Sequence, residues 1–315
     1  MQKILVLVLT LLMLSQATFS KELPSAFHSN LIYLKPKLED GTVLKIFTDT
    51  GGGWNAISKE LTEKHKWPLY ERQGDRDLIY VTDMPVFAKD SSIPLASLSN
   101  WWQGKLQVVP RKKLSHLDDV DGFLGGRWHA EKILDFNYPS KMISNLASLP
   151  DISQFSKHKL GFQKNKDGNY TMAFPSFKIV IEGKTIPMLF DTGASAWPSS
   201  EAKEILKAND NQIATSFVIA SIFDKWVEDH PEWLVINEAC TFSKQPMIRV
   251  PEVKLGKRVV GPVWFTRRAD HNFHNYMSSM MDRKIDGAIG GSALQYVRVI
   301  IDYPLETAYI SNSIR

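Results

Sequence analysis

Ile186-Pro-Met-Leu-Phe-Asp191-Thr-Gly-Ala-Ser195 is the stretch that decides the fold, because an apolar run ends there in an Asp-Thr-Gly triplet. The same triplet follows an earlier apolar run and begins at Asp49. A given triplet occurs by chance in roughly one chain in ten of this length. Two copies in the same context indicate that Asp49 and Asp191 occupy equivalent places in two related halves of the chain.

Each triplet follows a predicted β-hairpin. In the first half, the apolar runs 31–34 and 42–47 flank an Asp-Gly turn. In the second half, residues 177–181 and 185–190 flank a turn centred on a glycine. Glycine turns between apolar runs are typical of hairpins. The order strand, turn, strand, Asp-Thr-Gly is therefore written twice.

A short helix is expected after each triplet. Ser58 can cap the first of these helices, and Ser200 can cap the second, where Glu201 supplies an acidic first turn. The second half is longer between its motifs and is expected to contain an added helix around residues 222–235.

A second repeated block follows later in each half. Residues 120–126 read Val-Asp-Gly-Phe-Leu-Gly-Gly, and residues 285–291 read Ile-Asp-Gly-Ala-Ile-Gly-Gly. A predicted strand comes after each block, at 133–137 and at 299–302, and each strand leads into a Tyr-Pro pair. Four matched elements in the same order indicate an internal duplication.

The N-terminus is predicted to be a signal peptide over residues 1–20. Its apolar run is too short to span a bilayer, and small residues suited to cleavage follow it. No later stretch is long and apolar enough for a stable membrane insertion. We therefore expect a secreted, periplasmic monomer with one half-domain over residues 21–150 and another over residues 151–315.

The composition argues against several other classes of protein. The formal net charge of +4 comes from 38 basic and 34 acidic residues that are well mixed, so no basic stripe for nucleic acid is present. Cys240 is the only cysteine, which excludes an intramolecular disulfide and predicts a small buried side chain. His271 and His274 have a metal-like spacing without a third ligand near them, so neither a metal site nor a cofactor is expected.

Alternating strands and glycine turns with few helices predict a mostly β fold of two duplicated antiparallel half-domains. If each half presents one carboxylate to the other, the two groups cannot both ionise easily, and one keeps a proton. The charged group can then take a proton from water while the protonated group polarises a carbonyl. This chemistry hydrolyses a peptide bond without a metal or a covalent intermediate.

The paired Asp-Thr-Gly motifs, each followed by an apolar-apolar-Gly motif, resemble the aspartic peptidases of the pepsin and retropepsin type. The strand endings around Asp135 and Asp302 resemble bacterial retropepsin-like domains. The resemblance covers both halves, about residues 30–312. It implies a bilobal pepsin-like acid protease fold with a few short helices, a catalytic dyad of Asp49 and Asp191, and a peptide or protein substrate bound in extended form.

Further residues are expected to support this dyad. The glycines of the triplets are expected where the backbone turns sharply and offers N–H groups to the carboxylates. The threonine hydroxyls are expected to form hydrogen bonds between the halves. By resemblance, the apolar-apolar-Gly segments pass under the catalytic loops. The predicted supporting residues are Thr50, Gly51, Thr192, Gly193, Ser195, Gly125 and Gly290. Tyr80, before a predicted turn, is the candidate flap tyrosine that would contact substrate.

The motifs depart from the pepsin pattern in three places. Gly52 and Ala194 stand where pepsins place a serine or threonine, and Thr48 replaces an apolar residue before the first aspartate. Without the missing hydroxyls, a negative charge on the dyad is less stabilised, so raised pKa values and activity towards neutral pH are expected. Ser195 lacks the sequence context of a nucleophilic serine.

Two other functions remain open from the sequence. The first is a non-catalytic member of the same fold that binds peptide or carbohydrate, since the glycines after Asp49 could loosen its loop. The second is a secreted structural or adhesion protein, which would leave the paired motifs unexplained. Asp121 and Asp286 precede glycines in the repeated blocks and are expected to be structural turn carboxylates.

Overall fold

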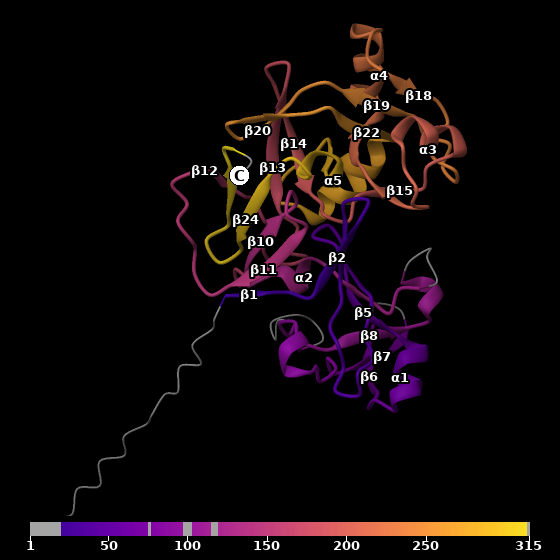
Figure 1. The fold of residues 1–315 in the computed structure, drawn as a ribbon, viewed down its shortest axis with the longest axis vertical. Coiled ribbons are helices and arrows are strands. Elements are labelled where there is room, and N and C mark those ends of the chain that lie inside the picture. The colour runs from indigo at the N-terminus through magenta and orange to yellow at the C-terminus, as the bar shows by residue number, and fades with distance from the viewer. Residues whose placement is uncertain (1–19, 75–76, 97–102, 115–118, 314–315) are drawn as a thin grey trace, which may run out of the picture.

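The computed structural model describes residues 20–74, 77–96, 103–114 and 119–313. The predicted signal peptide falls almost entirely in residues 1–19, outside this described part. The chain forms two β lobes that are joined by a sheet to which both contribute (Figure 1). Residue 150, where the sequence places the boundary, lies between two strands of this joining sheet.

The N-terminal lobe is built on one sheet, in which the described residues form eight strands. Their spatial order is β2 (Ser25–His28), β3 (Leu31–Leu34), β4 (Ile46–Thr48), β9 (Gly122–Leu124), β5 (Asn55–Ser58), β8 (Leu106–Val109), β7 (Leu78–Thr82) and β6 (Tyr70–Gln73). The predicted first hairpin is present as the antiparallel pair β3–β4, although β4 is shorter than the predicted run 42–47.

The C-terminal lobe has a larger sheet, with nine strands among the described residues. Their spatial order is β18 (Val235–Ile236), β19 (Met247–Val250), β22 (Val263–Arg268), β17 (Ser216–Ile219), β23 (Gly287–Ile289), β14 (Lys184–Phe190), β13 (Ser176–Ile181), β20 (Val253–Leu255) and β21 (Arg258–Val260). The pair β15 (Ser195–Ala196) and β16 (Ile213–Ala214) forms a separate small ribbon. The predicted second hairpin is confirmed as β13–β14.

The joining sheet contains strands from both halves, which meet at one pair of strands. In the described residues its order is β1 (Lys21–Glu22), β11 (Met142–Leu146), β10 (Ile133–Asn137), β24 (Arg298–Asp302), β25 (Thr307–Ser311) and β12 (Phe155–Lys159). The two strands predicted after the repeated blocks, β10 and β24, pair with each other antiparallel, with Leu134 opposite Ile301. The equivalent strands of the two halves are thus direct neighbours.

The helices are short, as predicted. They are α1 (Lys59–His65), α2 (Gly126–His129), α3 (Ser200–Leu206), α4 (Ala220–Asp229) and α5 (Gly291–Leu294), with single turns η1 (Lys89–Ser91), η2 (Arg111–Lys113), η3 (Asn272–Tyr276) and η4 (Met277–Met280). Ser58 caps α1 as predicted, by accepting a hydrogen bond from the Leu61 amide. The predicted cap Ser200 is wrong by one residue, because Ser199 accepts the amide of Ala202 and Ser200 is the first helical residue.

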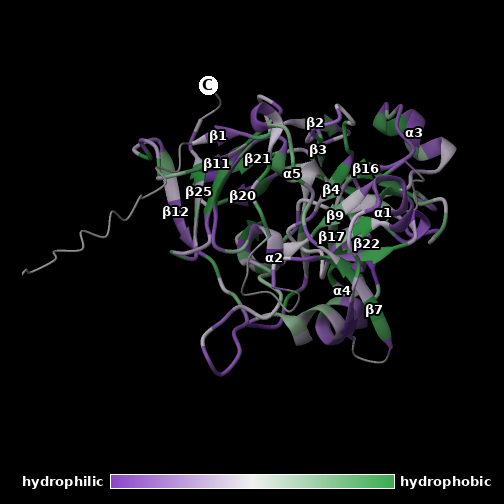
Figure 2. Ribbon diagram, turned by 90° about the horizontal axis from the view of Figure 1, so that it is seen from below, coloured by the Kyte–Doolittle hydropathy of each residue, from purple (hydrophilic) through white to green (hydrophobic). Residues whose placement is uncertain are grey.

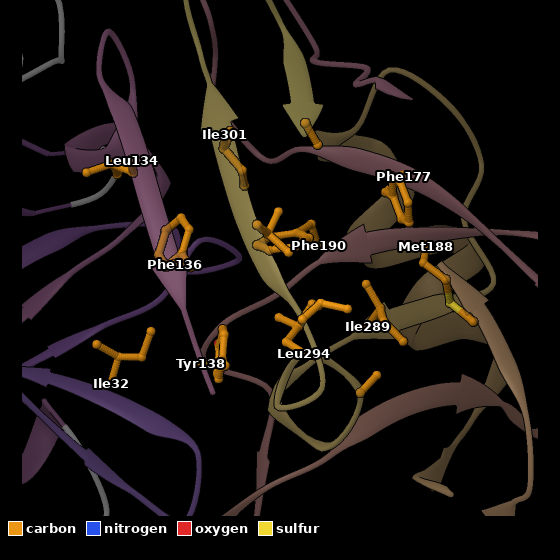
Figure 3. Close-up of a cluster of buried hydrophobic side chains, with 14 of the residues drawn as sticks. Ile32, Leu134, Phe136, Tyr138, Phe177, Met188, Phe190, Ile289, Leu294 and Ile301 are labelled. Atoms are coloured by element: carbon orange, nitrogen blue, oxygen red, sulfur yellow. The ribbon is translucent and has the colours of Figure 1, made fainter. Parts of the chain in front are cut away.

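The hydrophobic core is continuous across the two lobes and the joining sheet. Phe136 of β10 and Phe190 of β14 lie 6.2 Å apart between ring centroids, and the surrounding apolar side chains come from all three sheets (Figure 3). Hydrophilic residues gather in the outer loops and helices (Figure 2). Cys240 is buried, as predicted. None of the helices in the described residues is long and apolar enough to cross a membrane.

A partly buried ion pair stabilises the joining sheet, and loss of either partner is predicted to have a different effect on stability. Arg298 donates to both carboxylate oxygens of Asp135, from Nε at 2.9 Å and 3.1 Å. The Asp135 side chain is 7% exposed, whereas that of Arg298 is 36% exposed. Because an unpaired buried charge is costly, Arg298→Ala is expected to lower the free energy of unfolding by roughly 3 kcal/mol, and Asp135→Ala by less.

Urea unfolding of the two variants measures this difference. Lys59→Ala, which removes an exposed ion pair with Glu63, serves as a control that should leave stability nearly unchanged. Equal losses in Arg298→Ala and Asp135→Ala would show that desolvation of Asp135 does not set the cost.

Candidate active site

Two equivalent strand ends bring the aspartates together. Asp49 follows β4, and its amide donates to the Leu124 carbonyl of β9 at 3.0 Å. Asp191 follows β14, and its amide donates to the Ile289 carbonyl of β23 at 2.9 Å. Both supporting pairs are parallel, so the apolar-apolar-Gly strands lie beside the strands that carry the aspartates. The repeated blocks therefore support the triplets, as the resemblance implied.

Reciprocal hydrogen bonds between the threonines join the two triplets. The Thr50 amide donates to Thr192 Oγ1 at 3.1 Å, and the Thr192 amide donates to Thr50 Oγ1 at 3.0 Å. Each hydroxyl then donates to a carbonyl of the other half: Thr50 to Phe190 O at 2.7 Å, and Thr192 to Thr48 O at 3.5 Å. Both threonines are fully buried, so these bonds fix the halves without competition from solvent.

The carboxyl groups of Asp49 and Asp191 are in hydrogen-bonding contact with each other. Within each triplet the amide two residues on donates to its aspartate: Gly51 to Asp49 Oδ1 at 2.8 Å, and Gly193 to Asp191 Oδ1 at 3.0 Å. Both aspartates remain half-buried, so water reaches the pair. The structure thus brings together the two residues that the sequence predicts to form a dyad.

The glycines of the triplets donate their amides to the aspartates, as predicted, and they are also required by close approach. A Cβ atom on Gly193 would lie 2.2 Å from Asp49 Cγ, and one on Gly51 would lie 2.9 Å from Asp191 Cγ. Neither glycine has a positive φ angle. Each glycine therefore makes room for the carboxyl group of the opposite half, in addition to donating its amide.

Burial and mutual repulsion set the protonation of the dyad. Burial raises the pKa of Asp191 well above its ordinary value, and the charge of Asp49 raises it further. Burial also raises the pKa of Asp49, while hydrogen bonds from Asp191 and from backbone amides oppose this rise. The pair therefore holds one proton over a wide pH interval.

The glycine after the first triplet is explained by an aromatic neighbour. A Cβ atom on Gly52 would lie 2.4 Å from Cε1 of Phe123, so the serine or threonine of pepsins does not fit here. In the second half, the Ser195 hydroxyl accepts a hydrogen bond from Gln212 Nε2 at 2.7 Å. Residue 52 therefore supplies no hydroxyl to the dyad, and the Ser195 hydroxyl has Gln212 as a partner.

The predicted supporting glycines lie against the loops they were expected to support. The Gly125 amide donates to Trp54 O and to Asn55 Oδ1, both at 2.9 Å. The Gly290 amide donates to Ser216 Oγ at 3.1 Å. A Cβ atom on either glycine would lie within 2.2 Å of a backbone oxygen, from Gly52 or Thr215 respectively. Both positions therefore require glycine because the backbones pack so closely.

Thr48, the polar residue before the first aspartate, has a partner that the sequence analysis missed. Its Oγ1 lies 2.8 Å from Nε2 of His129, and Nδ1 of the same ring lies 2.9 Å from the Gly125 carbonyl. His129 ends α2 and is fully buried, and burial lowers its pKa to about 3. A buried polar residue so near a catalytic-type motif was the signal that could have prompted a search for this histidine.

The other polar residues of the repeated blocks have structural partners. Asp121 accepts from Arg111 Nη2 at 2.7 Å, and Asp286 lies 2.9 Å from His274 Nε2. Both aspartates therefore hold neighbouring loops, as expected. Within the described part of the chain, no three His, Cys, Asp or Glu residues are grouped in a way that could hold a metal ion.

A cavity of about 510 Å³ opens beside the dyad, between the lobes. Asp49, Gly193, Ser195 and Gln212 line it, together with the apolar side chains Phe47, Trp54, Leu114, Phe123 and Trp197 and the lysines Lys112 and Lys113. No motif marks Trp54 and Trp197, although each follows a triplet at a similar distance. The cavity offers apolar walls next to a partly exposed acid pair.

Tyr80, the candidate flap tyrosine, lies on β7 and outside the lining of this cavity. Its side chain is exposed, and its hydroxyl group is 3.5 Å from Glu71 Oε1 on the neighbouring strand β6. A contact between Tyr80 and substrate stays a prediction.

Asp191→Asn is expected to stabilise the fold at neutral pH but not in acid. A carboxyl group whose pKa is higher in the folded than in the unfolded state is penalised when it ionises, so wild-type stability falls as pH rises above the unfolded value of about 3.9. Asparagine cannot ionise but can still donate to Asp49. The stability gained by the variant should therefore grow as the pH rises. Its full size should be about 1.4 kcal/mol for each unit by which folding raises the pKa of Asp191.

Urea unfolding of both proteins at several pH values between acid and neutral measures this gain. Asp167→Asn, at an exposed position in a loop, is the control and should show no such trend. A gain that stays constant or shrinks as pH rises would contradict a raised pKa at the dyad.

Comparison with solved structures places most of the chain in a known fold. The chain matches conglutin gamma, a basic 7S globulin from lupine seeds, with a TM-score of 0.50 and 10% sequence identity, over 94% of this chain and 95% of that one. It also matches the basic 7S globulin from soybean, with a TM-score of 0.48 and 9% identity over the same shares. No protein-family model and no curated protein matches the sequence. The chain has a mostly β, bilobal pepsin-like fold with a few short helices.

Proposed function

We propose that the protein is an aspartic endopeptidase that hydrolyses peptide bonds with a water molecule activated by Asp49 and Asp191. The observation that supports this proposal most directly is the contact between the two carboxyl groups, held by the reciprocal bonds of Thr50 and Thr192. A purely structural pair of buried acids would be an unfavourable feature, because burial penalises their charge. A shared proton between two partly exposed acids is suited to general acid–base chemistry.

The proposed reaction uses the two acids in opposite roles. A water molecule attacks the carbonyl carbon of the scissile bond; charged Asp49 takes a proton from it, and the proton of Asp191 passes to the carbonyl oxygen. The tetrahedral intermediate then collapses as the carbon–nitrogen bond breaks. The leaving nitrogen takes the proton from Asp49, and the hydroxyl group returns one to Asp191, so that the dyad is restored.

The proposed substrate is an extended peptide or unfolded protein segment that enters between the lobes. The apolar walls of the cavity beside Asp49 are suited to a large side chain of such a peptide, because burying apolar area there favours binding. Together with the predicted signal peptide, this suggests a secreted enzyme that acts outside the cytoplasm, in the periplasm, as a monomer.

The alternative is a non-catalytic member of this fold that binds peptide or carbohydrate. The matched lupine protein is named a seed globulin and not a peptidase, which favours this alternative. The absence of a hydroxyl at Gly52 also points this way, since one contact that pepsins make to the dyad is missing here. In this case the cavity would hold its ligand intact, and the acids would serve binding alone.

Cleavage of an unfolded protein separates the two functions. The wild-type protein is expected to cut a reduced, denatured substrate, and pepstatin should block the cut. Asp49→Ala and Asp191→Ala should each lower the rate at least about a hundredfold, because each removes one partner of the proton transfer. The exposed Asp167→Ala is the matched control and should cut like the wild type.

Two outcomes would contradict the proposal. If the wild type binds the substrate without cutting it, the binding alternative holds. If cleavage persists in both dyad variants, a contaminating or different activity is responsible.

The pH dependence of cleavage follows from the direction of the pKa shifts. Asp191 must keep its proton and Asp49 must be charged, and both pKa values are raised. The active form of the pair therefore persists to higher pH than it would for ordinary carboxyl groups. The pH–rate profile should have its optimum well above about pH 3.5 and extend towards neutral pH, whereas an optimum below that value would contradict the raised pKa values.

A further inference from the structure

We propose that His129 is a positioning residue for the dyad, because it joins the residue before Asp49 to the segment that supports the catalytic loop. The inference rests on the proposed function only in its kinetic test. It begins from a fully buried histidine that the reaction described above does not use.

The hydrogen bonds of His129 define its tautomer. The Gly125 carbonyl can only accept, so Nδ1, at 2.9 Å, carries the proton. Burial keeps the ring neutral by lowering its pKa to about 3. Nε2 is then unprotonated and accepts the hydroxyl proton of Thr48 at 2.8 Å. His129 is therefore a directional link between Thr48 and Gly125, with one bond to each.

This link continues to the other half of the molecule. Thr48 O accepts the hydroxyl of Thr192 at 3.5 Å, and the next residue along the chain is Asp49. Gly125 in turn donates to the loop after Asp49 through Trp54 O. His129 thus restrains the catalytic loop from both of its ends, through Thr48 before it and through Gly125 beneath it.

The second half of the chain lacks this link. The residue before Asp191 is Phe190, and the residue that ends α5, the counterpart of α2, is Leu294. Both belong to the buried hydrophobic cluster (Figure 3). A polar pair in one half stands where the other half has an apolar pair, at the same two positions of the duplicated motif. Apolar packing is sufficient to fill these positions, so the polar pair adds directional bonds that packing alone does not supply.

The surroundings of the ring keep it in one orientation. The ring lies edge-on to Trp128, with the two ring centroids 5.0 Å apart. Its plane is inclined by 30° to the ring of Phe136 and by 28° to that of Tyr303. The charged group that faces it is Lys132, whose ammonium group donates to the Trp128 carbonyl. The ring is therefore a rigid connector, and titration of His129 itself is not part of the proposal.

The test replaces the polar pair by apolar residues and follows the dyad directly. The variants are Thr48→Val, which keeps the shape but removes the hydroxyl, His129→Leu, which copies the second half, and the double variant. Leu294→Met, a volume-conserving change at the counterpart position, is the matched control. Each single change should lower kcat roughly tenfold with little change in KM, since small displacements of a catalytic group reduce rate strongly. The double variant should be no worse than the singles, because both remove the same bond.

Carboxyl ¹³C NMR titration of aspartate-labelled protein gives a readout that needs no activity. In the wild type the two dyad carboxyls should titrate far apart, because they share one proton. In Thr48→Val and His129→Leu the titration midpoints of the two carboxyl groups should move closer together, since a loosened loop weakens the interaction between the carboxyl groups. His129→Gln, which can still accept from Thr48, should restore part of the separation.

The outcomes separate a positioning role of His129 from a role in stability alone, and they separate this inference from the proposed peptidase function. Variants that melt at lower temperature but keep the wild-type midpoints and kcat would overturn the positioning role. If the wild type cuts nothing while the midpoints still converge in the variants, the positioning role holds and the peptidase proposal fails. Should His129→Leu not fold, Thr48→Val alone decides, because it leaves the ring in place.

Discussion

The reciprocal hydrogen bonds between Thr50 and Thr192 are the interaction on which the rest of the site depends. They join main chain to side chain across the two halves, so that neither triplet can shift without breaking two buried bonds. An unmade buried bond costs more than a made one contributes. The contact between the aspartates is therefore imposed by the surrounding backbone. This allows the structure to hold an acid pair that would otherwise separate.

Much of this arrangement could be predicted from the sequence because duplication repeats a pattern. The hairpins, the strands after the repeated blocks and the pairing of Asp49 with Asp191 all follow from matched motifs. The steric requirement for the triplet glycines could not be predicted, since it depends on how closely the opposite half approaches. The cap of α3 was misplaced by one residue because Ser199 and Ser200 are equally able to cap a helix.

The buried contacts of individual side chains could also not be predicted from the sequence. Gly52 is explained only by the position of the Phe123 ring, and Thr48 only by His129. In both cases the partner lies far along the chain, with Phe123 inside the second repeated block and His129 just after it. A duplicated chain makes such departures informative, because the equivalent position in the other half shows what the fold requires.

The joining sheet has a consequence for the origin of the chain. In the described residues, the strands of the first half lie on one side of this sheet and those of the second half on the other, and the halves meet where β10 pairs with β24. A fragment ending near residue 150 would lose the neighbour of its strand β10, and the remaining fragment would lose that of β24. An ancestor with a single copy of the motif would thus have needed a second identical chain to complete both the sheet and the acid pair, as a two-fold symmetric dimer.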